Sequence, residues 1–373
     1  MKKILLVTLF FLLVVLSGCS GRQKLLILNW GEYISDEVVE KFEQEFNADV
    51  IISLADSNEL FYSKVKDGTT AYDLVVPSDY MIEKMVSKDL LQKIDLSKLD
   101  NYDIINNPFM SGVLGIQEKM FEGNVEYHVP YFWGTFGLMY NKNKDGLEEA
   151  VNEYGWKAFF EEDKRPKNTR VGMYDVPRFA YAASLLYNDM SPNLATSAAL
   201  DLSYKTLSTF KFHEWGTDTL KKGISADNLD LAFVYTGDFL DALYVKLEET
   251  KLEDIKFDIY IPENTIAFMD SLVITKNARH VDLAHKFINF MLEPENAYLN
   301  ASVIGYCTPL LNTYEMITAN IDSEDEWLSS WAYATQKYYP NTENFLGTPI
   351  ANLDRNFLSD INTMVNNAKA KWR

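Results

Sequence analysis

The sequence is poor in cysteine, with only Cys19 and Cys307 among 373 residues. Cys19 follows a predicted export signal, and its acylation would leave Cys307 without a partner for an intramolecular disulfide. The fold must then be stabilised by hydrophobic burial rather than by cross-links. A hydrophobic content of 47% and a length that fits two domains better than one allow substantial cores.

The sequence also lacks the common motifs of catalysis and nucleotide binding. It contains no P-loop, no G-x-S-x-G elbow, no H-E-x-x-H and no C-x-x-C. Among the four histidines, His280 and His285 are five residues apart, the wrong spacing for two ligands on one helical face, and His128 and His213 are isolated. We therefore predict a protein that is not an enzyme and has no catalytic residue, cofactor or bound metal.

Basic residues are outnumbered, with 35 lysines and arginines against 54 acids and a net charge of −19. Cleavage before Cys19 would remove two lysines and no acid, leaving −21. This balance repels nucleic acid and suits cationic partners. A solvated, charged surface that keeps the protein soluble is the simpler explanation, because bulk charge alone does not identify a ligand.

The N-terminus has the pattern of an export signal. A basic "MKK" precedes "ILLVTLFFLLVVL", which is too short for a comfortable membrane span, and small residues follow. The end of this segment, "LSGC", resembles the bacterial lipobox, so we predict a signal peptide over 1–18, acylation of Cys19 and a tether over 19–23. The alternative is an ordinary signal peptide with an incidental cysteine. The protein would be lipid-anchored to the cell membrane on its extracytoplasmic side, in the periplasm if an outer membrane is present.

Beyond the tether, short apolar segments alternate with amphipathic helical patterns. Ser35 is placed to cap the first helix, in which Val38, Phe42 and Phe46 recur on one face. The predicted first unit has strands over 25–30, 49–53 and 72–78 and helices over 35–46 and 59–68. A second unit, from about residue 131, has strands over 170–175, 257–262 and 267–276, helices over 178–187 and 281–292, and a strand followed by a helix over 229–244. Residues 310–373 are predicted to form helices that close one lobe.

The apolar strands lack clean alternation, which is typical of a mainly parallel sheet with helices on both faces. In such an α/β fold, ligands bind outside the carboxyl ends of the strands. Trp30, Tyr33, Ser78 and Tyr80 lie at or just past predicted strand ends. These four residues therefore predict a ligand site at that edge.

Several motifs then occur in a fixed order: "VVPSDYMIEKM", "VPYFWGTFGLMYNK", "MYDVPR", "VYTGD", "FMDSLVI", "INFMLEPENA" and "IGYCTP". In this order they resemble the spermidine/putrescine-binding lipoproteins and periplasmic proteins of polyamine ABC transporters. The resemblance implies a monomeric, two-lobed periplasmic-binding-protein-like type II fold, with the cleft between lobes joined by hinge segments. It places the first lobe in 24–131 plus 266–304 and the second in 132–265 plus 305–373. The partners that it implies are a polyamine and the permease subunits of an ABC importer, with no nucleic acid.

The resemblance also implies roles for individual residues. Asp270 falls where a carboxylate holds a ligand amine, Ser78 is at a polar contact position, and Asp238 matches an acid seen in many relatives. The residues that fall in the aromatic box of the family are Trp30, Tyr33, Tyr80, Tyr235, Phe268 and Tyr306. Aromatic faces cover the methylenes of a polyamine and attract its ammonium groups, whereas a buried ammonium also needs a carboxylate. A site made of acids and aromatic walls is therefore physically sound, and Glu32 is a further candidate acid beside Trp30 and Tyr33.

The segment "MYDVPRFA" departs from the family pattern. Relatives usually have an acid directly after the arginine, but here Phe179 follows Arg178. Val176 stands where many relatives are polar or acidic, and Asp175 lies one step before the usual position. Phe268 stands at a position that is usually tryptophan. The change could shift preference from spermidine towards putrescine, could let another acid substitute, or could indicate another cationic solute; the candidate substitutes are Glu32, Asp175, Glu214 and Asp238.

The predicted function is capture of putrescine or spermidine by an extracytoplasmic lipoprotein that delivers it to a permease. One alternative is the same fold holding ferric iron or another small cation, for which Tyr338 and Tyr339 are a possible tyrosine pair. A cysteine-dependent transferase that uses Cys307 is a second alternative, although no paired histidine is evident. An adhesin would be a third.

Overall fold

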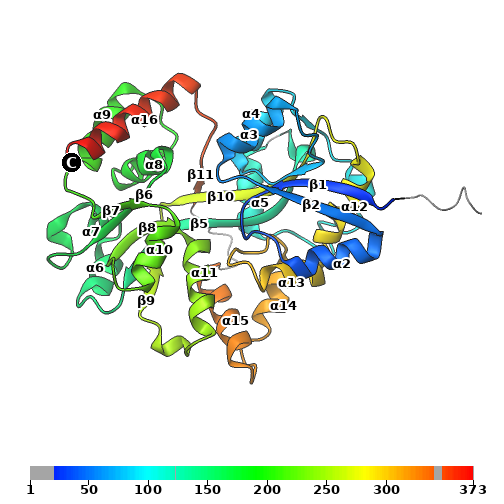
Figure 1. The fold of residues 1–373 in the computed structure, drawn as a ribbon. Helices are drawn as coiled ribbons and strands as arrows, with labels where there is room; N and C mark the ends of the chain where they lie inside the picture. The colour runs from blue at the N-terminus through cyan, green and yellow to red at the C-terminus, as the bar shows by residue number, and fades with distance from the viewer. Residues whose placement is uncertain (1–20, 122, 340–346, 373) are drawn as a thin grey trace, which may run out of the picture.

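The computed structural model describes residues 21–121, 123–339 and 347–372, and a mixed sheet runs through that part of the chain. The predicted signal peptide and Cys19 lie outside the described residues. Figure 1 shows the sheet crossing the whole molecule, with helices on both sides of it. The strand order is β2 (Ala48–Leu54), β1 (Gln23–Asn29), β3 (Leu74–Val75), β10 (Ile266–Thr275), β5 (Val129–Asn141), β8 (Leu231–Tyr235), β6 (Val171–Tyr174) and β7 (Glu214–Gly216). Three further strands pair off this path, β4 (Leu91–Gln92) and β11 (Thr348–Pro349) with β10, and β9 (Phe257–Tyr260) with β5.

The first half of the sheet pairs β1 in parallel with β2 and β3. Helix α2 begins after Ser35, as predicted, but the Ser35 side chain makes no capping hydrogen bond. Phe42 of this helix packs edge-on against Phe287 and Phe290, with ring centroids 5.0 and 5.4 Å apart. The helices around this half are α2 (Asp36–Phe46), α3 (Asn58–Asp67), α4 (Asp79–Ser87), α5 (Ser111–Met120), α12 (Val281–Met291) and α13 (Pro294–Ala301).

The second half pairs β6 in parallel with β7 and β8. Pro177 starts α8, where its fixed φ and missing N–H are tolerated. The C-terminal helix α16 packs on α8 and α9, which Figure 1 shows in red beside green. The helices of this half are α6 (Leu147–Tyr154), α7 (Trp156–Phe160), α8 (Pro177–Tyr187), α9 (Ser197–Leu207), α10 (Asp218–Ser225), α11 (Thr236–Leu247) and α16 (Arg355–Ala370). Helix α14 (Leu311–Thr318) contacts α13, and α15 (Glu326–Tyr338) contacts α14 and α11, so these two join the halves.

Strands β5 and β10 lie side by side in the middle of the sheet and belong to both halves (Figure 1). They run antiparallel to each other, β10 is antiparallel to β3, and β5 is antiparallel to β8. The expectation of a mainly parallel sheet is therefore wrong at the centre. Every residue of both strands is buried, so neither strand shows the alternation of buried and exposed residues that would mark an antiparallel strand. The pairing of β10 with β5 shifts register between Asp270 and Ser271, and such an irregularity re-aims side chains.

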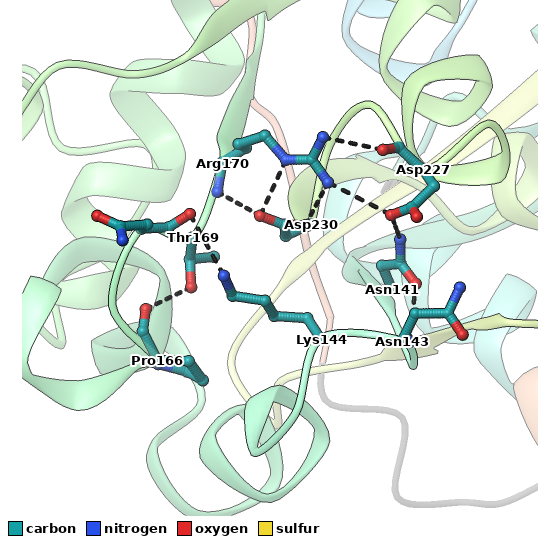
Figure 2. A network of polar contacts seen from close by, with 9 residues as sticks. Asn141, Asn143, Lys144, Pro166, Thr169, Arg170, Asp227 and Asp230 are labelled. Atoms are coloured by element: carbon teal, nitrogen blue, oxygen red, sulfur yellow. Dashed lines mark hydrogen bonds and ion pairs between the residues drawn. The ribbon is translucent and has the colours of Figure 1, made fainter.

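A polar network ties the start of β6 to the loop before β8 (Figure 2). Arg170 donates from Nη2 to Asp230 Oδ1 at 2.7 Å and from Nε to Asp230 Oδ2 at 3.1 Å. Nη1 donates to the backbone carbonyl of Asp227, whose carboxylate also accepts from Asn141. Burial raises the pKa of Asp230, but the hydrogen bonds from the side chain and backbone of Arg170 outweigh it and hold the pKa below its ordinary value.

Replacing Asp230 by asparagine is expected to lower the free energy of unfolding by about 1–3 kcal/mol, because it removes a buried, charge-assisted hydrogen-bond acceptor. Because the folded-state pKa of Asp230 is lowered, its contribution to the free energy of unfolding is fully present above the unfolded-state pKa. This contribution is lost as the pH falls from there through the folded-state pKa. Urea denaturation at pH 7 and pH 3 measures both effects. Asp227→Asn is the control, since that side chain is 62% exposed and should change stability by less than about 0.5 kcal/mol. Equal losses of stability in Asp230→Asn and Asp227→Asn would contradict the conclusion that the buried Asp230 carboxylate stabilises the fold more than the exposed Asp227 carboxylate does.

Candidate ligand-binding site

Asp270 lies at the point where β10 passes from one half of the sheet to the other. Tyr33 donates a hydrogen bond from its hydroxyl to Asp270 Oδ2 at 2.6 Å, and Ser78 forms an isolated antiparallel bridge with Asp270. The other carboxylate oxygen, Oδ1, is buried and has no hydrogen-bond partner within residues 21–121, 123–339 and 347–372. Burial raises the pKa of Asp270 to about 6, although hydrogen bonds from Ser78 and Tyr33 lower it. A buried carboxylate with one unused oxygen is the group that a cationic ligand requires.

The turn after β1 separates two residues that are adjacent in the sequence. Glu32 has a left-handed φ of 51° and an exposed side chain, whereas Tyr33 is buried. Tyr131 donates from its hydroxyl to the Tyr33 carbonyl at 2.7 Å and holds this turn against β5. Trp30 is half-buried, donates from its indole N–H to the Val76 carbonyl at 2.8 Å, and packs edge-on against Phe61.

A second buried carboxylate, Asp238, comes from the first turn of α11 on the other half of the sheet. Tyr306 donates to Asp238 Oδ1 at 3.3 Å, and Lys221 Nζ is 3.7 Å from the same oxygen. The second oxygen, Oδ2, is buried and has no hydrogen-bond partner in the described part of the chain. Burial raises the pKa of Asp238 to about 6, while the charge of Lys221 lowers it. Asp238 therefore resembles Asp270 in burial and in its one unused oxygen.

Aromatic rings join the two carboxylates. The ring of Tyr306 is edge-on to Tyr33 at 5.0 Å and to Phe268 at 6.0 Å between centroids, and Phe268 is edge-on to Tyr235 at 4.9 Å. These rings come from the turn after β1, from β10, from the end of β8 and from the loop before α14. They provide flat apolar walls with an acid at each end.

The predicted site residues divide into two groups. Asp175 has an exposed side chain that forms an ion pair with Lys369 of α16, and Glu32 points to solvent. Glu214, the other candidate substitute, accepts a hydrogen bond from Thr219 instead. Trp30 packs behind the end of β3, against Phe61. The residues linked to Asp270 or Asp238 by hydrogen bonds, a bridge or ring contacts are Tyr33, Ser78, Tyr235, Phe268 and Tyr306.

Two buried charged residues, Asp79 and Arg178, were not predicted as ligand contacts. Asp79, at the start of α4, is 1% exposed, and its Oδ1 accepts from the Tyr80 backbone N–H at 2.7 Å. Burial raises its pKa to about 8. Arg178, at the start of α8, holds its guanidinium carbon 4.1 Å from the centroid of the Tyr80 ring. Asp79 Oδ2 and Arg178 Nε and Nη2 are buried and have no hydrogen-bond partner among the described residues. The signal that could have identified Asp79 is an acid directly after Ser78, between two apolar segments.

Phe179, at the position where the family resemblance implies an acid, packs among aromatic rings. Its ring lies 4.9 Å from Phe136 and 5.8 Å from Tyr235, and its side chain is buried. Arg178 and Tyr80 line a groove of about 980 Å³ between α3 and α4 on one side and the starts of α8 and α16 on the other. At this groove the helices of the two halves approach each other.

The alternative functions depend on Cys307 and on the pair Tyr338 and Tyr339. Cys307 is buried with its Sγ 4.0 Å from Met110 Sδ, and burial raises the pKa of its thiol, which is the reverse of an activated nucleophile. Tyr338 donates a hydrogen bond from its hydroxyl to Asp258, whereas the buried Tyr339 hydroxyl has no partner among the residues that the structure describes. Within residues 21–121, 123–339 and 347–372, no group of three or more His, Cys, Asp or Glu is arranged to hold a metal. Over the same ranges, no helix is long and apolar enough to cross a bilayer.

The chain is similar to known proteins in sequence. Residues 37–334 match the family described as bacterial extracellular solute-binding protein. The spermidine/putrescine-binding periplasmic protein of Salmonella typhimurium is 30% identical over 313 residues, which are 82% of this chain and 83% of that protein. The putrescine-binding periplasmic protein SpuD of Pseudomonas aeruginosa is 29% identical over 304 residues, which are 79% of this chain and 80% of that protein.

Solved structures show the same architecture. The spermidine/putrescine ABC transporter substrate-binding protein PotD of Streptococcus pneumoniae superposes with a TM-score of 0.74 at 29% identity, covering 94% of this chain and 100% of that one. The Tp0655 (TpPotD) lipoprotein of Treponema pallidum superposes with a TM-score of 0.71 at 27% identity, covering 93% of this chain and 100% of that one. These likenesses confirm the predicted two-lobed fold.

Proposed function

Because the chain belongs to the family of bacterial extracellular solute-binding proteins, we propose that it captures a di- or polyamine between two lobes and delivers it to the permease of an ABC importer. It catalyses no reaction. The relatives named for spermidine or putrescine binding support this ligand class. The lobes proposed are residues 24–131 with 266–304 and residues 132–265 with 305–373.

The observation that carries the proposal is the buried carboxylate of Asp270, with Oδ1 unused and aromatic rings beside it. A diamine has an ammonium at each end of an apolar chain, so it needs separated acids and flat walls between them. Asp270 and Asp238 meet the first requirement, and the rings of Tyr33, Tyr306 and Phe268 meet the second. Each cation–π contact contributes about 0.5–2 kcal/mol, and more as water is excluded.

We propose closure of the lobes because the groups that would contact the ligand come from different parts of the sheet. Tyr33 follows β1 in the first half of the sheet and holds Asp270 on the central strand β10, whereas Asp238 and Tyr235 are held by the second half. A ligand that contacts both sets binds the closed arrangement more tightly than the open one and so shifts the population towards closure. The permease would recognise the closed form.

Lipid anchoring through Cys19 belongs to the same proposal. The "LSGC" segment supports it, and the relative from Treponema pallidum is a lipoprotein by name. Residues 19–23 would tether the protein to the membrane, although Gln23 is already part of β1. Globomycin, which blocks lipoprotein signal cleavage, should cause accumulation of the uncleaved precursor in cells that express the full chain, and Cys19→Ala should release the processed protein from the membrane fraction.

The test of function is isothermal titration of the processed chain, from residue 20, after unfolding and refolding to remove bound amine. Putrescine, cadaverine, spermidine and spermine are titrated in turn. Saturable one-to-one binding of at least one amine is expected. No heat with any of them, from protein shown by circular dichroism to be folded, would mean that the cleft holds a different solute.

Two predicted acids are expected to be dispensable. Glu32→Gln and Asp175→Asn should each leave amine affinity within about twofold, because exposed charges are screened by water and salt, and Asp175 is already paired with Lys369. The measurement is the same titration with the best-binding amine. A tenfold loss in either variant would show that its side chain turns into the cleft when ligand binds.

A further inference from the structure

Asp79 has the features of a ligand-binding acid rather than of a helix-capping one. An acid at the start of a helix is stabilised by the helix dipole, but this requires no burial. Asp79 is 1% exposed, and its Oδ2 has no partner in the part of the chain that the structure describes. Its neighbour Ser78 is paired directly with Asp270, and the charge of Asp270 raises the pKa of Asp79 further after burial has done so. The two carboxylates are therefore close enough to interact.

The charges buried around the site show why a third acid is needed. Lys221 Nζ lies 2.7 Å from Asp241 and 3.7 Å from Asp238, so Asp241 balances its charge, and Arg178, 7% exposed, is the buried cation that remains. With Arg178, the carboxylates of Asp270 and Asp238 sum to one negative charge, which is one short of the two positive charges of a diamine. Asp79 supplies the missing negative charge, and it does so beside Asp270, where an unused oxygen is already present.

We propose that Asp79 is a third amine-recognition carboxylate, and that with Asp270 it forms a pair that holds one ammonium group of the ligand. The inference rests on the proposed function and deepens it. The pair compensates for the acid that is replaced by Phe179, but on the opposite half of the sheet. Asp238 then receives the second ammonium, at the far side of the Tyr306 ring.

Proton release on binding follows from this pairing. Two neighbouring buried carboxylates share a proton until a cation arrives, because both cannot ionise in a water-poor site without compensation. When an ammonium binds between them, the proton leaves to the buffer and the second carboxylate ionises. The charged or titratable groups around Asp79 are Asp270 of β10, Arg178 of α8, Tyr80 of α4 and, next to Tyr80 and Arg178, Glu59 of α3.

The test is titration of putrescine into the processed wild-type chain and Asp79→Asn at pH 7, in phosphate and in Tris, whose ionisation enthalpies differ. The wild type is expected to release a fraction of a proton up to one proton per amine. The variant should bind about 10- to 100-fold more weakly and release fewer protons. Asp36→Asn, at the first position of α2 and exposed, is the matched control and should change neither quantity.

Three results would overturn the inference. Unchanged affinity and unchanged proton release in Asp79→Asn would leave amine binding intact but remove Asp79 from it, whereas no amine binding by the wild type would overturn the proposed function as well. The third possibility, that Asp79 only neutralises Arg178, is tested by repeating the substitution in an Arg178→Met background. The loss of affinity is expected to persist there; its disappearance would make Asp79 a counter-ion and sink the proposal.

Discussion

Replacing Asp270 by asparagine is expected to weaken amine binding by about 30-fold to several thousand-fold, which corresponds to about 2–5 kcal/mol for loss of one partner of a buried charge pair. Asparagine keeps the shape of the side chain and can still accept the hydrogen bond from Tyr33, so the loss reports the charge. Isothermal titration with the best-binding amine measures it. Affinity within threefold of the wild type would place the ligand elsewhere.

The same substitution should stabilise the ligand-free protein. Burial raises the folded-state pKa of Asp270 from 3.8 to about 6, so protonation of this group favours the folded over the unfolded chain. The folded chain therefore loses stability as the pH rises through this range. At pH 7 the variant avoids that cost, which amounts to about 1–3 kcal/mol. Asp230→Asn is the matched control for a buried acid: it should lose stability and keep its amine affinity, the reverse of Asp270→Asn.

Amine affinity of the wild type should also depend on pH. The ligand requires ionised carboxylates, and Asp270 and Asp238 both have pKa values raised to about 6. Affinity should therefore rise as the pH increases from 5 to 8 while the amines remain protonated. In Asp270→Asn this rise should be smaller, since one titrating carboxylate is gone while Asp238 and Asp79 still titrate.

Replacing Gly237 by alanine is expected to weaken amine binding by about 10- to 100-fold without touching an acid. A Cβ at this position would lie 2.3–2.5 Å from three atoms of the Tyr306 ring, so the ring must move. Movement removes one wall of the site and the hydrogen bond that Tyr306 donates to Asp238, each worth about 0.5–3 kcal/mol. Titration with the same amine measures the loss.

Gly115→Ala provides the control for this substitution. Gly115 also lies within a helix, α5, but a Cβ there would meet nothing within 4 Å. That variant should keep its affinity and gain up to about 1 kcal/mol in stability, because alanine is the better helix former. If Gly237→Ala bound amine as tightly as Gly115→Ala, the Tyr306 ring would have no part in recognition.

Local patterning was sufficient for most of the elements. The apolar stripe of α12, with Leu283, Phe287, Ile288 and Met291 buried, follows directly from its spacing along the chain. Strand β5 was different, since all of its residues are buried and it pairs antiparallel with both β10 and β8. Periodicity reports which faces are apolar; it does not report which strands run beside one another.

In the candidate site, too, the residue types follow from the sequence, but their contacts depend on the fold. Tyr33 and Asp270 were both identified from motif positions, but their contact joins residues 237 positions apart. Glu32 is adjacent to Tyr33 in the sequence and carries a suitable carboxylate, yet a left-handed turn points it to solvent. Asp79, beside a predicted contact residue, was overlooked because an acid at the start of a helix is usually solvated.

The sequence by itself determined the kind of protein and the chemistry available to it. Strand–helix alternation predicts an α/β fold, the shortage of histidine and cysteine offers little for catalysis, and the ordered motifs resemble those of polyamine-binding receptors. The tertiary structure decided which acids are buried together and which remain in water. Whether two acids are buried and face each other across a cleft depends on how β5 and β10 bring distant segments together. Local sequence determines only the propensity of each segment to form a helix or a strand.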